Sequence, residues 1–176
     1  MRWMRLAAAL VSATVLLSAC IDDESSTPEG YQLIELGQAT LVIPDDWTLV
    51  RAGQRHGDFD LEARGPADEL VFGVARTVAS SDVTALLATQ RSARVRGLPG
   101  YEEIGDDRAV TVFNGDGRRI DYTYEDPSVG VSGRGVDVVT LGPGSSGILL
   151  SVTATDEAYD EREFDTIANS VQYVGG

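Results

Sequence analysis

Short runs of apolar residues alternate with polar positions along much of the chain. Residues 31–36 and 39–43 are two such runs, separated by Gly37, and the second ends at a turn that begins with Pro44. Proline halts a strand because it has no N–H to donate to a neighbouring strand. Residues 70–78 are rich in Val, Phe and Leu and predict a buried strand. The pattern therefore predicts several short β-strands in the first part of the folded region.

Two hairpins are predicted further along. Residues 108–113 and 118–124 alternate apolar and polar positions on either side of residues 114–117, Asn-Gly-Asp-Gly. Such residues tolerate the positive φ angles that tight hairpin turns require. Residues 135–141 and 147–155 predict a second antiparallel pair around the glycine-rich segment in between.

Apolar residues recur at helical spacing in two other segments. Residues 83–96 follow the N-cap candidates Ser80, Ser81 and Asp82, and residues 160–170 carry a second apolar stripe. The first helical face consists of Val83, Leu86, Leu87 and the polar Gln90. The second stripe consists of Phe164, Ile167, Ala168 and, just beyond residue 170, Val171. Together the segments predict an α+β domain, in which an antiparallel β-sheet of about six or seven strands packs with two helices that bury one face.

The first twenty residues have the features of a secretory leader. Arg2 and Arg5 precede an apolar stretch that ends at Leu17-Ser18-Ala19-Cys20, and the stretch is shorter than the roughly 20 residues that a membrane-spanning helix needs. Leu-Ser-Ala-Cys resembles the bacterial lipobox. That resemblance implies that residues 1–19 are a lipoprotein signal peptide and that Cys20 is acylated and becomes the new N-terminus. The alternative is a buried structural cysteine after an uncleaved leader.

The mature chain divides into a tether and one domain. Residues 20–30 are acidic, contain Ser, Thr, Pro and Gly, and have no hydrophobic periodicity, which predicts a flexible tether. Beyond residue 30 we find no long linker and no internal repeat, so residues 31–176 are interpreted as a single domain.

Composition excludes several kinds of chemistry. All 14 basic residues are arginine, against 28 acidic residues, and the chain has one Cys and one His. Without lysine there is no P-loop lysine, Schiff base or Ser–Lys dyad. A single cysteine excludes an internal disulfide and any cysteine-clustered metal site. A net charge of −14 disfavours nucleic acid as a partner.

A family resemblance rests on two local signatures. Residues 41–47 form a hydrophobic strand that ends in a Pro-x-x-Trp turn, and residues 164–171 form a final helix that leads into a short strand. With a central helix and a meander between them, residues 31–173 resemble the Mog1/PsbP-like superfamily. The lipobox makes the chain most similar to the LpqN/LpqT type of actinobacterial lipoprotein. The resemblance implies a Mog1/PsbP-like αβ sandwich and a binding or accessory role without shared catalytic residues.

The sequence offers several candidate sites. A sheet–helix pocket for a small ligand would be lined by Trp47, Phe72, Leu86, Leu87 and Tyr122, although core packing is the favoured role for Trp47 and Tyr122. His56 is the only histidine that could act as the base of a hydrolase, and it also fits a polar loop. Five arginines form either a basic patch or a solvated face: Arg91, Arg94, Arg96, Arg118 and Arg119.

Three functional hypotheses follow. The first is a membrane-anchored envelope lipoprotein that binds an envelope protein or an apolar or glycolipid ligand, without turnover, metal or cofactor. The second is an envelope hydrolase that uses His56 with a nearby carboxylate. The third is an ion-binding protein that uses the abundant carboxylates.

Overall fold

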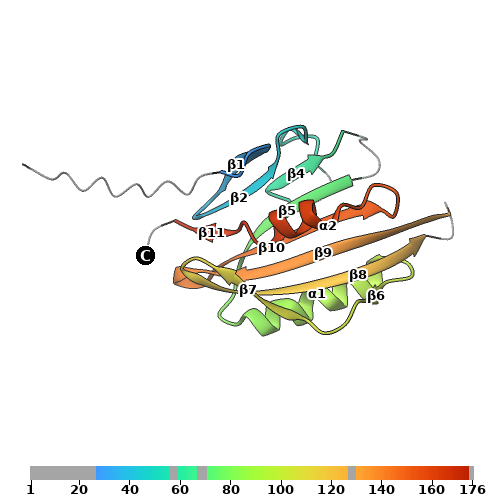
Figure 1. Ribbon diagram of the computed structural model, residues 1–176. Coiled ribbons are helices and arrows are strands. Elements are labelled where there is room, and N and C mark those ends of the chain that lie inside the picture. Colours follow the sequence, from blue (N-terminus) through green and yellow to red (C-terminus); the bar gives the residue numbers. More distant parts are fainter. Residues whose placement is uncertain (1–26, 56–58, 67–70, 127–129, 175–176) are drawn as a thin grey trace, which may run out of the picture.

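The computed structural model describes residues 27–55, 59–66, 71–126 and 130–174, which fold into two antiparallel sheets and two α-helices (Figure 1). The elements in chain order are β1 (Tyr31–Leu36), β2 (Ala39–Pro44), β3 (Thr48–Leu49), β4 (Leu61–Arg64), β5 (Val71–Ala79), α1 (Val83–Gly97), β6 (Glu102–Glu103), β7 (Arg108–Val112), β8 (Gly115–Asp126), β9 (Val131–Leu141), a 3₁₀ turn (Pro143–Ser145), β10 (Ser146–Thr155), α2 (Glu161–Ala168) and β11 (Gln172–Tyr173).

The larger sheet has eight strands and the smaller sheet has three. The order in the larger sheet is β3-β4-β5-β10-β9-β8-β6, with β7 also paired to β8, and the order in the smaller sheet is β1-β2-β11. The α+β class and the antiparallel pairing are confirmed. The antiparallel sheet packed with two helices is confirmed as well. The finer expectation that both helices bury one face was wrong, because the two helices lie on opposite faces of the larger sheet. In addition, β1, β2 and β11 form a separate layer (Figure 1).

The main core lies between the larger sheet, the smaller sheet and α2. Phe164 and Ile167 of α2 are fully buried there, beside Val138 of β9 and Leu41 of β2. Trp47 belongs to this cluster and is 4% exposed, so its packing role is confirmed. Burial of these side chains supplies the hydrophobic stabilisation that holds α2 in place.

A smaller core lies under α1, on the other face of the sheet. Leu87 packs there against Ile120, Val139 and Leu149. Neighbouring residues along a strand point to opposite faces, and Val138 and Val139 accordingly belong to the two different cores. Among the described residues, no helix combines the length and hydropathy that a membrane span requires.

The helix starts and the second hairpin agree with the sequence prediction, whereas the first hairpin turn is shifted. Asp82 caps α1 by accepting from Thr84 N at 2.8 Å. In the first hairpin Val112 pairs with Gly115, so that Phe113 and Asn114 form a two-residue turn in which Asn114 has φ 57°. The predicted turn at residues 114–117 was therefore wrong, because residues 115–117 belong to β8.

Candidate functional site

An open groove of about 730 Å³ lies between α2 and the outer face of the smaller sheet. Its apolar part consists of Pro28, Leu33 and Val42. The remaining lining side chains are polar or charged: Thr27, Thr40, Glu161, Arg162, Asp165, Thr166, Asn169, Ser170 and Gln172. The groove therefore combines a small hydrophobic floor with many hydrogen-bonding groups.

The positions of the groove-lining side chains follow from which sides of α2 and β2 are buried in the main core. The buried stripe of α2 fixes which side of the helix is outward, and Arg162, Thr166 and Asn169 lie on the outward side. In β2, Leu41 and Ile43 face the main core while Thr40 and Val42 face the groove.

The end of α2 is joined to the floor of the groove by a hydrogen bond. Val42 N donates to Ser170 Oγ at 2.9 Å. This bond satisfies a backbone donor of β2 at a position beyond the two residue pairs that β2 forms with β11. The floor and the wall of the groove are therefore fixed relative to each other.

A second hollow of about 590 Å³ adjoins the groove and shares Pro28, Arg162 and Thr166 with it. It adds Tyr31, together with Glu29, Asp160 and Glu163. Burial, followed by the nearby charges of Asp160 and Asp46, raises the pKa of Glu163. An occupant that extended along α2 would thus meet the ring of Tyr31 and a carboxyl group that is easier to protonate than usual.

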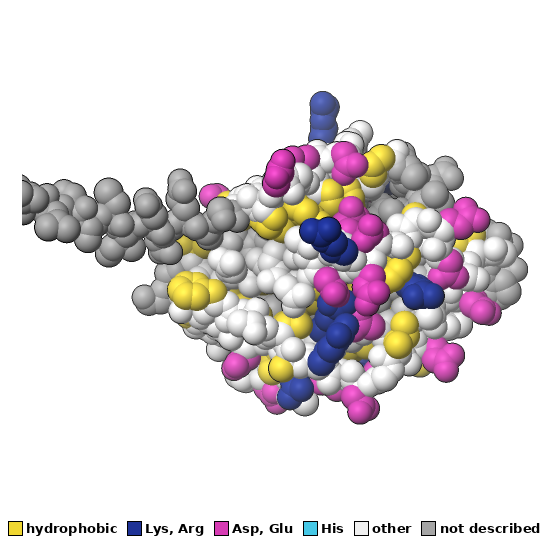
Figure 2. Space-filling view, in the orientation of Figure 1, with side chains coloured by type: hydrophobic (Ala, Val, Ile, Leu, Met, Phe, Trp, Pro, Cys, Tyr) yellow, Lys and Arg dark blue, Asp and Glu magenta, His cyan; other side chains and the backbone are white. Residues whose placement is uncertain are grey.

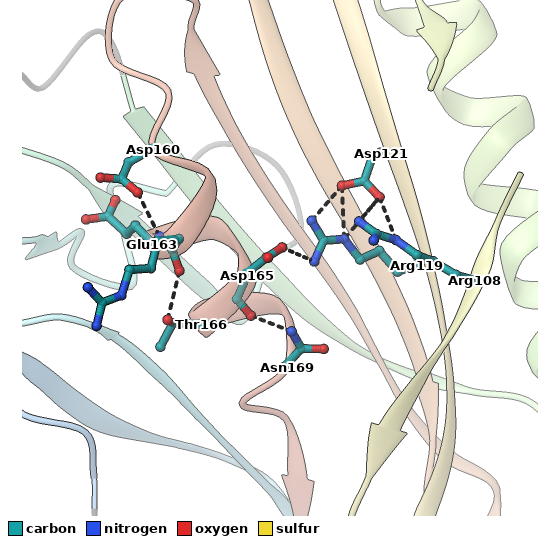
Figure 3. Close-up of polar contacts among 9 residues, drawn as sticks. Arg108, Arg119, Asp121, Asp160, Glu163, Asp165, Thr166 and Asn169 are labelled. Carbon is teal, nitrogen blue, oxygen red and sulfur yellow. Dashed lines mark hydrogen bonds and ion pairs between the residues drawn. The ribbon is translucent and has the colours of Figure 1, made fainter. Parts of the chain in front are cut away.

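A buried arginine fixes α2 to the larger sheet. Arg119 of β8 is only 3% exposed and donates to both carboxylate oxygens of Asp121, and its Nη1 donates to Asp165 of α2 at 2.5 Å. Arg108 of β7 also donates to Asp121, at 2.8 Å (Figure 3). Burial tends to lower the pKa of Arg119, but the hydrogen bonds to the two carboxylates outweigh it and raise that pKa. The groove wall is therefore held by a charge-assisted network.

A second polar cluster lies under α1 around Asp137, which is fully buried. Its carboxylate accepts from Arg94 Nε and Nη2, both at 2.7 Å, and from Ser151 Oγ at 2.6 Å. Gln90 Nε2 donates to it at 2.9 Å and the Tyr122 hydroxyl at 3.3 Å. Each of these polar side chains has a hydrogen-bond partner within the cluster, so we interpret the cluster as a structural element that joins α1 to the sheet.

The sequence left a basic patch or a solvated face open for five arginines, and four of them are engaged in ion pairs instead. Arg94 pairs with Asp137, Arg119 with Asp121 and Asp165, Arg91 with Glu103 and Asp107, and Arg118 with Asp107. Each of these four cations is thus matched by at least one carboxylate. These contacts connect α1 and α2 to the sheet and leave little uncompensated positive charge.

The five residues predicted to line a ligand pocket are not brought together in one cavity. Trp47 lies in the main core, whereas Leu86 and Leu87 lie in the small core under α1. Tyr122 is 0% exposed on the α1 side of the sheet, where its ring lies 5.3 Å from the Arg94 guanidinium. Phe72 belongs to β5, but its side chain is outside the described part. Ligand binding by these residues stays a prediction, and the hollows described above are lined by others.

Two further predicted residues lie outside the described part, namely Cys20 and His56. The lipidation of Cys20 and the hydrolase hypothesis for His56 therefore stay predictions. Within the described ranges, no group of three or more His, Cys, Asp or Glu side chains is arranged to hold a metal ion.

Sequence reasoning missed the groove, although one signal pointed to it. Arg162, Thr166 and Asn169 are spaced as neighbours on one side of a helix. Nothing in the sequence, however, indicated that Leu33 and Val42 would lie opposite this helical side. That arrangement depends on the smaller sheet forming a separate layer.

Comparison with known proteins shows the fold. No protein-family model matches the sequence, and no curated protein matches it significantly. The solution structure of cyanobacterial PsbP (CyanoP) from Synechocystis sp. PCC 6803 matches with a TM-score of 0.58 and 15% identity, over 85% of this chain and 95% of that one. The crystal structure of LpqN, described as involved in cell envelope biogenesis of Mycobacterium tuberculosis, matches with a TM-score of 0.54 and 15% identity, over 82% and 91% of the two chains.

A third similar structure comes from Bacteroides thetaiotaomicron, with a TM-score of 0.54 and 11% identity, over 78% of this chain and 46% of that one. The expected resemblance to the Mog1/PsbP-like fold is confirmed by CyanoP and LpqN. At these identities the likeness concerns the fold alone.

Proposed function

We propose that this protein is a membrane-anchored lipoprotein of the cell envelope that acts as a non-catalytic binding module, with the groove beside α2 as its binding site. The observation that carries the proposal is the groove itself. Its volume of about 730 Å³ is within the range of roughly 300–1,000 Å³ typical of small-ligand sites. It also includes Thr27, the first described residue, which belongs to the expected tether of residues 20–30.

The lining favours an amphiphilic ligand of the apolar or glycolipid kind. Leu33 is 48% exposed on the groove floor and offers contact to an acyl chain or another apolar group, beside Val42, which is 5% exposed. Thr40, Asn169 and Gln172 supply hydroxyl and amide groups to a polar head. The fold shared with LpqN, a protein involved in cell envelope biogenesis, supports an envelope role by analogy.

The charged groups of the groove support binding rather than turnover. Asp165 already accepts a hydrogen bond from the buried Arg119, so its carboxylate serves to hold α2 against the larger sheet. Among the described lining residues there is neither His nor Cys. The hydrolase alternative depends on His56, which lies outside the described residues.

The groove is tested by filling it. In Thr166→Trp an indole would occupy the groove, because Thr166 lines it from the outward side of α2. Thr89→Trp is the matched control, since both threonines donate to the carbonyl four residues earlier in their helices, Thr166 to Arg162 and Thr89 to Ala85. Each lipoprotein is purified from its native membrane, and the lipid that remains bound is quantified by mass spectrometry.

We expect Thr166→Trp to reduce bound lipid at least tenfold and Thr89→Trp to leave it unchanged. Undiminished lipid on a folded Thr166→Trp variant would contradict the proposal. A photo-crosslinking residue in place of Asn169 separates the two kinds of occupant, because capture of an envelope protein instead of a lipid would replace the small-ligand version with protein recognition.

Anchoring is tested at Cys20. In Cys20→Ser the thiol that the lipobox presents for acylation is lost. We expect the wild-type protein to incorporate a clickable fatty acid and to partition into the detergent phase, and the variant to do neither. Label in the variant, or wild-type protein without label in the aqueous phase, would contradict lipid anchoring.

A further inference from the structure

One end of the domain carries no charge in any of its three turns. Residues 37–38 join β1 to β2, residues 113–114 join β7 to β8, and residues 142–145 join β9 to β10. All eight of these residues are uncharged, although 24% of the chain is Asp, Glu or Arg. The turns meet around β11 at the left-hand end of Figure 1.

Backbone contacts bring the turns together. Val174 N donates to Gln38 O at 2.9 Å, and Tyr173 N donates to Phe113 O at 3.2 Å. Gly142 lies so close to the Tyr173 ring that an added Cβ would come within 2.4 Å of it. The three turns and the end of β11 therefore form one continuous surface, which we refer to as the uncharged end.

Two large apolar side chains project from the uncharged end. Phe113 is 64% exposed and Val174 is 65% exposed. Figure 2 shows mainly uncharged and hydrophobic side chains at the left-hand end of the domain, whereas the charged side chains gather over its middle and right. An aromatic side chain at the tip of a hairpin, without neighbouring charges in its turn, suits the boundary between water and lipid.

The expected anchor leads to the same end. Thr27 and Gln172 both line the groove, and Gln172 forms a β-bridge with Phe113. Seven residue-to-residue steps separate Cys20 from Thr27, and at about 3.6 Å per step they reach at most about 25 Å. An acylated Cys20 would thus hold the uncharged end near the bilayer.

The negative net charge of the protein favours one orientation of the domain on the bilayer. The net charge of −14 means that most faces of the domain are repelled by anionic headgroups, and the uncharged end is the surface with the least repulsion. We infer that the uncharged end, with Phe113 and Val174 at its tip, rests on the lipid surface. This inference depends on the lipid anchoring of the proposed function. It would place the groove, through Gln172, beside the membrane from which a lipid ligand comes.

The test uses fluorescent probes on the acylated protein. Because Cys20 is the only cysteine and its sulfur is blocked by lipidation, an introduced cysteine is the unique thiol. Phe113→Cys and Val174→Cys are labelled with NBD and reconstituted in vesicles of phosphatidylethanolamine and phosphatidylglycerol that contain doxyl-labelled lipid. Val95→Cys is the control, since Val95 is 69% exposed on α1, away from the three turns.

We expect doxyl lipid to quench the probes at positions 113 and 174 at least threefold more than the probe at position 95. Equal quenching at all three positions on vesicle-bound protein would overturn the inference while leaving the anchor intact. A second outcome would also overturn it: the probes at positions 113 and 174 are shielded from water but not quenched by doxyl lipid, and the shielding increases with the density of protein on the vesicles. A second copy of the protein would then cover this end. Protein that does not float with the vesicles would instead refute the anchoring on which the inference depends.

Discussion

Arg94 of α1 and Asp137 of β9 form a bidentate ion pair inside the protein, with both N–O distances at 2.7 Å. Asp137 is 0% exposed. Burial tends to lower the pKa of Arg94, but hydrogen bonding and attraction to Asp137 outweigh it and raise that pKa. The pair fixes α1 to the sheet at a position where the hydrophobic contacts of the helix are few, since Leu87 is the only α1 residue among the described ones that is classed as buried.

Neutralising Asp137 is expected to destabilise the protein strongly. Asp137→Asn leaves the Arg94 guanidinium without its anion in a largely desolvated position, and loss of one partner of a buried pair costs about 3–5 kcal/mol. Asp156→Asn is the control, because the pair of Arg134 and Asp156 is about half exposed on both sides and such pairs contribute about 1 kcal/mol or less. Urea unfolding measures both variants, and similar losses would contradict the structural role of Asp137.

The guanidinium group of Arg119 donates to two carboxylates, so replacing this arginine by lysine is expected to lower the free energy of unfolding. Arg119→Lys keeps the charge but cannot donate to Asp121 and Asp165 in the same geometry, so we expect a loss of about 1–3 kcal/mol. Arg108→Lys, at a side chain that is 60% exposed and also pairs with Asp121, should cost less than about 1 kcal/mol.

Hydrogen exchange localises the effect of Arg119→Lys. The Arg119–Asp165 contact connects β8 to α2, so we expect faster exchange of the α2 amides in this variant and unchanged exchange in α1. Uniform acceleration across both helices would mean that the contact does not hold α2 specifically.

The sequence predicted those parts of the fold that depend on local patterns. Both helices begin where Asp82 and Asp160 supply capping carboxylates, and strand alternation identified the long antiparallel strands. The layer formed by β1, β2 and β11 was missed because β11 pairs with β2 across most of the chain, through Gln172↔Thr40 and Tyr173↔Ala39. No local pattern encodes a pairing at that separation.

The candidate site was missed for a related physical reason. The predicted pocket assigned Trp47 and Leu87 to one cavity because both are large and apolar, but large apolar residues are first of all core residues. The sheet separates them into two cores. The groove is lined instead by polar residues such as Thr166 and Asn169. A search for large hydrophobic residues does not identify a site of this kind.

A close contact between β8 and β9 makes Gly135 sensitive to substitution. Gly135 lies opposite Tyr122, and an added Cβ would come within 2.3 Å of its ring. Because both residues are buried, Gly135→Ala is expected to cost about 1–3 kcal/mol by overpacking. Gly97→Ala in α1, where nothing lies within 4 Å, should be neutral or stabilising by up to about 1 kcal/mol. Thermal unfolding compares the two, and a neutral Gly135→Ala would contradict the close packing of Tyr122.

The same tyrosine predicts how stability changes in alkali. Burial raises the pKa of Tyr122 well above its usual value, and the charge of Asp137 raises it further. Above pH of about 10 the unfolded chain loses the phenolic proton while the folded chain retains it. Because the folded state then binds more protons than the unfolded state, the free energy of unfolding falls as pH rises from there toward the folded-state pKa.

Removing the hydroxyl group should reduce this alkaline loss. Tyr122→Phe loses the hydrogen bond to Asp137, so at pH 8 we expect a cost of about 0.5–1.5 kcal/mol. Between pH 10 and 11 the free energy of unfolding should fall less steeply than in the wild type, because one titrating group with a raised pKa is absent. Urea unfolding across this range gives both slopes. Equal slopes would show that Tyr122 does not hold its proton more tightly in the folded protein than in the unfolded chain.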